Sequence, residues 1–501
     1  MTDRIFVLHY AGELSVKAKG TRNRFSERLA RNLADALESA GVPFQIRRTW
    51  ARLYVESPSS RAAEVAARVF GVSAVTVAAK RSWQNLEEIL QAGEEIFASA
   101  VAGKTFAVRA RRGGRRQTMP FNSPEVEREL GARLLPGAAG VDLKTPEVEV
   151  RVELRRAQAY YSSHRIEGAS GLPLGTEGRA LALISGGFDS MVAAWLLLRR
   201  GVRLDYLFCN LSGEAHRDAV LRVMKVLADD WSYGYRPRLH LVDFKPVVAE
   251  LKAQCPQPLW QVVLKRQMLR TADRLARLLK VSGIVTGEAV GQVSSQTLQN
   301  LAVISSVTEI PILRPLIGSQ KDEIIALARR IGTHDLSAEV QEQCMLVPRH
   351  PETHAKPQKV LDAEVGLAPQ TLERLIEERA VFDLRVLNLD KTKAPGLEVE
   401  RIPEGAVVID LRSPVAYKAW HPPGALHLDY REALESYRSL EADKTYVFYC
   451  EVGLKSAHLA ELMHQAGFRA HHFGGGLKAL LRQVEQQDEA LRAVMSPVLL
   501  D

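Results

Sequence analysis

Apolar and polar stretches alternate through most of the chain and predict strands and helices in turn. Short apolar runs at residues 4–10, 181–184 and 445–449 are typical of buried strands, whereas 25–41 and 260–279 are long enough for helices. Strands that alternate with helices predict an α/β protein. Because 501 residues exceed what one hydrophobic core supports, three or four domains are expected.

Residues 1–60 are predicted to fold as a strand, a helix and a hairpin of two further strands. The segment 17–24, between the first strand and the helix at 25–41, carries four cations and no acid. Most such runs are solvated loops, but at the mouth of a helix a basic loop is also a candidate phosphate contact. The candidate RNA-binding residues in this loop are Lys17, Lys19 and Arg22.

Residues 61–165 form a second predicted unit with a basic strand. The run 104–116 holds six cations and no acid, and Phe106 and Val108 alternate with polar positions as in a half-buried strand. This unit resembles a THUMP domain, an RNA-binding module of tRNA-modifying enzymes, preceded by its ferredoxin-like partner. The candidate RNA-binding residues are Arg109, Arg111 and Arg112. A basic strand alone supports only a general nucleic-acid patch.

Charge and cysteine usage narrow the class of protein. A net charge of +8 favours an acidic partner. The four cysteines, Cys209, Cys255, Cys344 and Cys450, have no metal-ligand spacing, which suits a reducing cytoplasm. Neither a signal peptide nor a spanning apolar stretch is recognisable, so a cytoplasmic protein without a membrane partner is expected.

The segment Ser185-Gly186-Gly187-Phe188-Asp189-Ser190 joins a predicted strand to a predicted helix. Glycines let the backbone turn tightly, and the free N–H groups of the turn and the helix start form an anion site. An ordinary turn needs only the glycines; the two hydroxyls and the carboxylate around them favour phosphate binding. No lysine follows, which excludes a Walker loop. The segment resembles the PP-loop of ATP pyrophosphatases.

From 175 to 385 the chain alternates strands and helices, as in a doubly wound parallel sheet. Together with the PP-loop, the segments 265–268, 286–300 and 313–318 resemble the tRNA 4-thiouridine synthetase (tRNA sulfurtransferase) family. One departure is Gln320, where the family usually has aspartate. The resemblance implies that Asp189 holds Mg2+ and that the following residues bind ATP: Leu183, Ile184, Ser185, Gly186, Gly187, Ser190, Lys265, Gly287, Gln296 and Lys321.

A further α/β unit follows a polar linker at 386–403 and occupies 404–501. It has an Asp-x-Arg strand end at Asp410, a His-Pro-Pro-Gly-Ala turn at His421 and a Cys-x-x-Gly-x-x-Ser loop starting at Cys450. These motifs resemble a rhodanese domain. Successive N–H groups of such a loop, with a helix behind them, stabilise a thiolate or a persulfide.

The resemblance also implies a mechanism with two catalytic cysteines. A uridine of tRNA, at position 8 in the family, would be adenylated with ATP. A cysteine desulfurase would load sulfur onto Cys450, and Cys344 would release the product and leave a Cys344–Cys450 disulfide. Cys209 and Cys255 are interpreted as structural thiols.

Two other classes of function stay open at this point. A persulfide relay acting on a protein thiocarboxylate would not need the basic strand, and an RNA-binding protein with degenerate catalytic domains would not be expected to keep Asp189 and the Cys450 loop together. Some relatives also feed the thiazole branch of thiamine synthesis, so a thiamine sulfur-carrier protein is a candidate partner. The sequence leaves this role, the identity of the desulfurase and a homodimeric state undecided.

Overall fold

The computed structural model describes residues 4–483 except 51, 114–119, 156, 341–347, 349, 390–395 and 452. It divides into two compact units. The first consists of Met1–Gly178 and two short later segments of the chain, Leu197–Arg203 and Asp230–Tyr235. The second holds the remainder. No helix of the described residues is long and apolar enough to cross a membrane.

The first unit is built on one eight-stranded sheet in the order β2-β3-β1-β4-β8-β7-β5-β6. Strand β4 pairs with β1 on one side and β8 on the other, so both predicted N-terminal units share this sheet. Its strands are β1 Arg4–Tyr10, β2 Gln45–Arg48, β3 Arg52–Ser57, β4 Val72–Ser82, β5 Thr105–Gly113, β6 Gly140–Val141, β7 Val148–Arg155 and β8 Gln158–Glu167.

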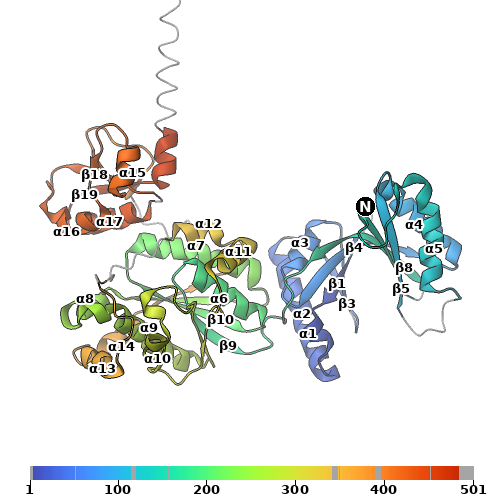
Figure 1. Ribbon diagram of the computed structural model, residues 1–501, viewed down its shortest axis with the longest axis horizontal. Helices are drawn as coiled ribbons and strands as arrows, with labels where there is room; N and C mark the ends of the chain where they lie inside the picture. Colours follow the sequence, from blue (N-terminus) through green and yellow to red (C-terminus); the bar gives the residue numbers. More distant parts are fainter. Residues whose placement is uncertain are drawn as a thin grey trace, which may run out of the picture. The chain divides into compact units, whose positions relative to one another are not determined.

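Helices cover the sheet of the first unit in two groups. The first group packs near β1 and β4 and the second near β5, β7 and β8 (Figure 1). In β5, Phe106 and Val108 are buried as predicted, and Ala107 and Ala110 are buried as well. The helices are α1 Gly12–Ser15, α2 Lys19–Ser39, α3 Arg61–Ala67, α4 Leu86–Val101 and α5 Ser123–Leu134.

The prediction of a loop at 17–24 is wrong for most of this segment. Helix α2 begins at Lys19, so most of the loop forms the first turns of the helix that was predicted to start at Phe25. Lysine and arginine are good helix formers, and together with the rest of α2 they outweigh the weaker preferences of Gly20, Thr21 and Asn23. The cations therefore line a helix start.

The part of the second unit that contains the predicted ATP site, residues 179–383, is the nucleotide domain. It has a six-stranded sheet in the order β13-β12-β9-β10-β11-β14. Strands β13, β12 and β9 are parallel to one another, as are β10 and β11, while β14 is antiparallel at the edge. Residues 180–182 of β9 and 204–210 of β10 are buried, which explains the largely apolar sequence of these strands. The strands are β9 Arg179–Leu183, β10 Arg203–Asn210, β11 Arg238–Asp243, β12 Ile284–Val285, β13 Ile312–Leu313 and β14 Ala380–Asp383.

The helices of this domain connect its strands. The long helix predicted at 260–279 is found with those bounds. The helices of this domain are α6 Phe188–Arg199, α7 Glu214–Trp231, α8 Lys245–Gln254, α9 Trp260–Leu279, α10 Leu298–Ser305, α11 Lys321–Ile331, α12 His334–Glu339, α13 Pro357–Glu364 and α14 Pro369–Glu377.

The C-terminal domain has a five-stranded parallel sheet in the order β15-β19-β18-β16-β17. Its first strand lies within the segment predicted as linker. The sheet elements are β15 Glu398–Val399, β16 Val407–Asp410, β17 Leu426–His427, β18 Thr445–Tyr449 and β19 Arg469–Phe473, and the helices are α15 Pro414–Ala419, α16 Tyr430–Ser436 and α17 Leu454–Gln465.

Candidate functional site

The glycine-rich turn lies between β9 and α6, as the sequence predicts. Leu183 ends β9, and the buried Ile184 follows it. The backbone N–H of Ser185 donates to Ser190 Oγ at 3.2 Å, and that hydroxyl donates to the Gly187 carbonyl at 3.0 Å. These bonds fold the turn back onto the first turn of α6. A glycine turn joined to a helix N-terminus in this way is a suitable anion site.

Two glycines allow other segments to approach this turn. Gly186 has φ +82°, and a Cβ there would lie 2.8 Å from Val220 Cγ2. A Cβ at Gly287, in the loop after β12, would lie 2.7 Å from the backbone of Asp189 and Ser190. Only glycine therefore lets the 287–297 loop close against the start of α6.

Asp189 and Lys321, two predicted site residues, form an ion pair. Lys321 begins α11, and its Nζ lies 2.8 Å from Asp189 Oδ1 and 3.1 Å from Oδ2. Gln292 Nε2 donates to the same carboxylate at 2.9 Å. Gln320 caps α11 with Glu323, so the residue that departs from the family pattern still starts the helix that carries Lys321.

Lys265 belongs to a second charged group beside the turn. Its Nζ lies 3.2 Å from Glu288 Oε1, and Arg314 Nε lies 2.8 Å from Glu288 Oε2. Burial alone raises the pKa of Glu288, but Lys265 and Arg314 outweigh it and hold that pKa below its ordinary value. The carboxylate thus joins α9, the loop after β12 and the segment after β13.

Gln296 supplies an unused polar atom in the same loop. It lies in the short 3-10 turn Ser294–Gln296 and is 9% exposed. Among the described residues, its buried Oε1 accepts no hydrogen bond. A buried acceptor without a partner is costly, so a ligand donor is a fitting partner for it.

Cys450 follows β18 and lies in a cradle of polar groups. The Gly453 N–H donates to Cys450 Sγ at 3.2 Å, and Ser456 Oγ lies 3.6 Å from the sulfur. Ser456 also donates to the Gly453 carbonyl at 2.9 Å, which fixes the hydroxyl. Because α17 starts directly behind this loop, the helix N-terminus favours negative charge on the sulfur.

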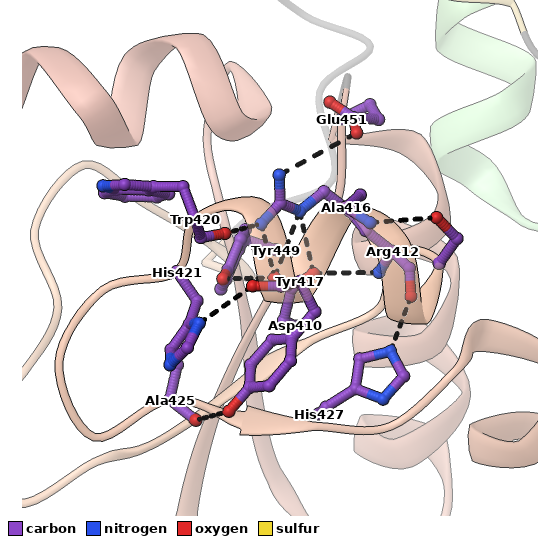
Figure 2. A network of polar contacts seen from close by, with 11 residues as sticks. Asp410, Arg412, Ala416, Tyr417, Trp420, His421, Ala425, His427, Tyr449 and Glu451 are labelled. Carbon is purple, nitrogen blue, oxygen red and sulfur yellow. Dashed lines mark hydrogen bonds and ion pairs between the residues drawn. The ribbon is translucent and has the colours of Figure 1, made fainter.

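The Asp-x-Arg motif braces the residues on both sides of Cys450 (Figure 2). Asp410 is fully buried and accepts from Arg412 Nη2 at 2.7 Å and from the Tyr449 hydroxyl at 2.5 Å. Arg412 Nη1 lies 3.9 Å from Glu451. Removal of one partner from a buried ion pair strongly destabilises the fold. This network therefore ties Tyr449 and Glu451 to the end of β16.

The two other described cysteines lack such a setting. Burial raises the pKa of Cys209 far above its ordinary value and that of Cys255 to about 11. Cys255 Sγ donates to the Ala363 carbonyl at 2.9 Å. Both thiols suit the predicted structural role. Cys344 lies outside the described residues.

The predicted RNA-binding residues occupy the start of α2 and the strand β5. Lys19 is exposed, Lys17 lies 5.7 Å from the Phe25 ring centre, and Arg22 stacks 4.4 Å above the Trp50 ring. Arg22 also donates to the carbonyls of Ser15 and Trp50. Part of this basic group thus holds the local fold.

The arginines of β5 also divide into one that is exposed and two that hold the local fold. Arg111 is exposed, whereas Arg109 donates to the Leu143 carbonyl and Arg112 to the Phe121 carbonyl, each at 2.5 Å. Arg111 is therefore the residue of this strand with the most accessible charge.

Comparisons with known proteins cover nearly the whole chain. Family models match the ferredoxin-like domain of ThiI at 5–76, a THUMP domain at 84–163, thiamine biosynthesis protein (ThiI) at 175–368 and a rhodanese-like domain at 398–483. The tRNA sulfurtransferase of Pyrobaculum aerophilum is 38% identical over 93% of this chain and 96% of its own length. That of Shewanella loihica is 33% identical over 92% and 98%. The chain belongs to the tRNA sulfurtransferase family.

A solved structure supports the same assignment. A 4-thiouridine synthetase in complex with RNA and with bound ATP aligns with a TM-score of 0.67 and 29% identity, covering 76% of this chain and 99% of that chain. A second structure, PH1313 from Pyrococcus horikoshii, aligns with a TM-score of 0.52 and 25% identity over 66% and 99%. The predicted family and the α/β multidomain fold are thereby confirmed.

Sequence reasoning missed several polar residues of this tRNA sulfurtransferase family member. Glu288 was recognised only as part of a matching segment, although it joins Lys265 and Arg314. Gln292 was not singled out, although it donates to Asp189. The available signal was that both residues lie within segments that resemble the family. The pairing of their side chains depends on the tertiary fold.

Proposed function

We propose that this protein is an ATP-dependent tRNA sulfurtransferase that makes 4-thiouridine at position 8 of tRNA. One observation carries the proposal. A chain of this family combines a glycine turn whose Asp189 faces Lys321 with a Cys450 sulfur that accepts the Gly453 N–H. The first arrangement suits adenylation with ATP, and the second suits a persulfide.

The nucleotide domain would activate the base. The turn Ser185–Ser190 binds the pyrophosphate end of ATP through backbone N–H groups, and Gln296 Oε1 accepts a donor from the nucleotide. The 4-carbonyl oxygen of uridine attacks the α-phosphorus, and pyrophosphate leaves. Lys321 and Lys265 stabilise the negative charge that develops on the phosphates.

Asp189 fits a magnesium ion. Its carboxylate lies at the first turn of α6 and is partly accessible, and its partners among the described residues are two side-chain donors, Lys321 and Gln292. A hard oxygen ligand in this position is what Mg2+ prefers. When bound, the ion would neutralise charge on the pyrophosphate.

The rhodanese-like domain would carry the sulfur. A cysteine desulfurase loads a sulfur atom onto Cys450, giving a Cys450 persulfide. Its terminal sulfur attacks C4 of the adenylated base, and AMP leaves with the former carbonyl oxygen. The Cys344 thiolate then attacks Cys450 Sγ, breaks its bond to the transferred sulfur and releases 4-thiouridine. The resulting Cys344–Cys450 disulfide needs two electrons from a thiol reductant.

RNA binding would use the first unit, with Lys17 just before α2, Lys19 and Arg22 on α2, and Arg109, Arg111 and Arg112 on β5. The 4-thiouridine synthetase that aligns with this chain was solved with RNA, which favours this role over a relay that acts on a protein thiocarboxylate. A sulfur supply to thiamine synthesis is favoured by the match to the thiamine biosynthesis protein family and stays a prediction.

A reconstituted reaction tests the proposal. Purified protein, unmodified tRNA, ATP with Mg2+, cysteine and a cysteine desulfurase should give tRNA with the near-ultraviolet absorbance of 4-thiouridine. Omission of ATP, or Asp189→Ala, should remove that absorbance. Sulfur transfer to a protein carboxylate with unmodified tRNA would instead support the relay.

A further inference from the structure

The loop after β10, residues 210–213, forms a platform that hydrogen bonds hold at the carboxyl edge of the nucleotide-domain sheet. Asn210 Nδ2 donates to the Gly213 carbonyl at 3.3 Å, and Asn210 Oδ1 accepts the Ser212 N–H at 3.1 Å. The Asn210 carbonyl accepts the Phe244 N–H at 2.8 Å. Strand β10 neighbours β9, which leads into the ATP-binding turn. The loop 210–213 and this turn thus leave the same sheet edge on adjacent strands.

A carboxylate of the rhodanese-like domain contacts the helix that starts from this platform. The backbone N–H of Glu214, the first residue of α7, donates to Glu461 Oε2 at 2.8 Å. Glu461 lies on α17 and is buried. Burial raises the pKa of Glu461, and the N–H groups at the start of α7 offset part of that rise, because a helix N-terminus stabilises a carboxylate.

Gly213 leaves the space that this carboxylate fills. A Cβ at Gly213 would clash with Glu461 Oε2 and lie 2.6 Å from its Cδ. Gly213 has no positive φ, so its backbone accepts a side chain without strain. Because the clash is with the tip of a flexible side chain, a methyl group here would displace Glu461 and leave the platform intact.

A second residue of α17 faces the same surface. His458, one turn before Glu461, is buried near His216 on α7 and Lys245 on α8. Burial, together with these two neighbours, lowers the pKa of His458 to about 4. The contacting helix is the one whose first turn holds the Cys450 sulfur.

We propose that the loop 210–213 and the first turn of α7 form the docking surface for the rhodanese-like domain, with Glu461 as its anchoring carboxylate. Docking there brings sulfur on Cys450 to the sheet edge at which ATP binds. The inference rests on the proposed function, because it names the surface across which that function moves sulfur between two domains.

The test uses the full-length protein with variants on both sides of the contact. Glu461→Lys places a cation at the helix N-terminus, and Gly213→Ala displaces the carboxylate. The matched control is Glu435→Lys, an exposed glutamate of α16 that lies 3.8 Å from Arg431. Hydrogen exchange of peptides covering 211–217 reports docking without any reaction. Single-turnover transfer from preloaded Cys450 persulfide to tRNA reports delivery.

Both contact variants should speed exchange at 214 and 215 and slow single-turnover transfer about tenfold. Pyrophosphate release and persulfide loading should match the wild type, because each occurs within one domain. Gly213→Ala should add nothing in a Glu461→Ala background, since both remove one contact. Unchanged exchange in Glu461→Lys would overturn the docking surface. Faster exchange with normal transfer would overturn its role in delivery, while failure of the wild type to thiolate tRNA would refute only the proposed function.

Discussion

Lys321 and Asp189, 132 positions apart in the chain, meet as an ion pair at the first turns of α11 and α6. The lysine side chain is 44% exposed and the aspartate 18% exposed. An ion pair at this level of exposure contributes about 1 kcal/mol or less to stability. Both groups can therefore separate at little cost, the carboxylate toward a metal ion and the ammonium group toward a phosphate.

Asp189→Ala should abolish pyrophosphate release and leave tRNA binding unchanged. The substitution removes the metal-binding carboxylate, whereas the basic surface lies in the first unit. We expect adenylation to fall at least about a hundredfold, because a positioned charge at phosphates contributes several kcal/mol to the transition state. Pyrophosphate release and filter binding of tRNA measure the two properties.

The control for this variant is Asp218→Ala, which removes a carboxylate of α7 that pairs with Arg217. It should keep adenylation. Asp189→Ala with normal pyrophosphate release would refute the assignment of the glycine turn as a PP-loop.

Arg111→Ala should lower the salt dependence of tRNA binding by about one unit of slope, because an exposed arginine on β5 is suited to a phosphate contact. Arg109 and Arg112 donate to backbone carbonyls. Replacement of all three arginines, Arg109, Arg111 and Arg112, with alanine should therefore also lower the thermal midpoint of the first unit. Arg128, an exposed arginine of α5 beside Glu129, provides the control Arg128→Ala. Equal slopes for Arg111→Ala and wild type would place the RNA site elsewhere.

Elements with strong periodicity could be predicted closely from the sequence. The helix at 260–279 and the strand at 445–449 have the predicted bounds, because a long amphipathic stretch and a short apolar run each allow one structure. The start of α2 could not be predicted, since Lys19–Arg24 carry no apolar face and suit a solvated loop and a helix equally well.

The residue types of the candidate site were predictable, but their pairings were not. Ser185–Ser190 and Cys450 lie in local motifs whose spacing fixes their geometry. The partners of Glu288 come from α9 and from the segment after β13, and no local pattern connects Lys265 to Arg314. Asp410 and Arg412 were recognised as a motif, yet their bond to Tyr449 arises only when β16 and β18 pair.

Glu288→Gln should destabilise the protein at neutral pH and lose this effect in acid. The folded pKa of Glu288 is depressed, so its charge stabilises the fold fully above the unfolded value of about 4.3. That contribution disappears as the pH falls through the lower folded pKa. We expect a loss of about 3 kcal/mol at pH 7, since one partner of a largely buried group is removed.

The measurement is the urea midpoint of wild type and variant at pH 7, 5 and 3. The difference between the two proteins should be similar at pH 7 and 5 and smaller at pH 3. Comparison of the two at each pH cancels the general acid destabilisation of the chain. A difference that grows toward low pH would contradict the depressed pKa.

The cysteines should separate into reactive and structural pairs in a single turnover. Cys450→Ala should lose sulfur transfer and keep adenylation, because the two reactions occur in different domains. Cys344→Ala should accept sulfur on Cys450 and fail to turn over. Cys209→Ser and Cys255→Ser are the controls, since their raised pKa values leave almost no thiolate at neutral pH.

Wild-type enzyme run without reductant should stop after about one cycle, because a spent disulfide has no thiolate to accept new sulfur. Peptide mapping of enzyme quenched at that point decides the pairing. A Cys344–Cys450 cross-link in an amount equal to the thiolated tRNA supports release by Cys344. Thiolated tRNA with both cysteines free would show that sulfur leaves Cys450 as hydrosulfide, and a cross-link that includes Cys209 or Cys255 would contradict the structural role of those thiols.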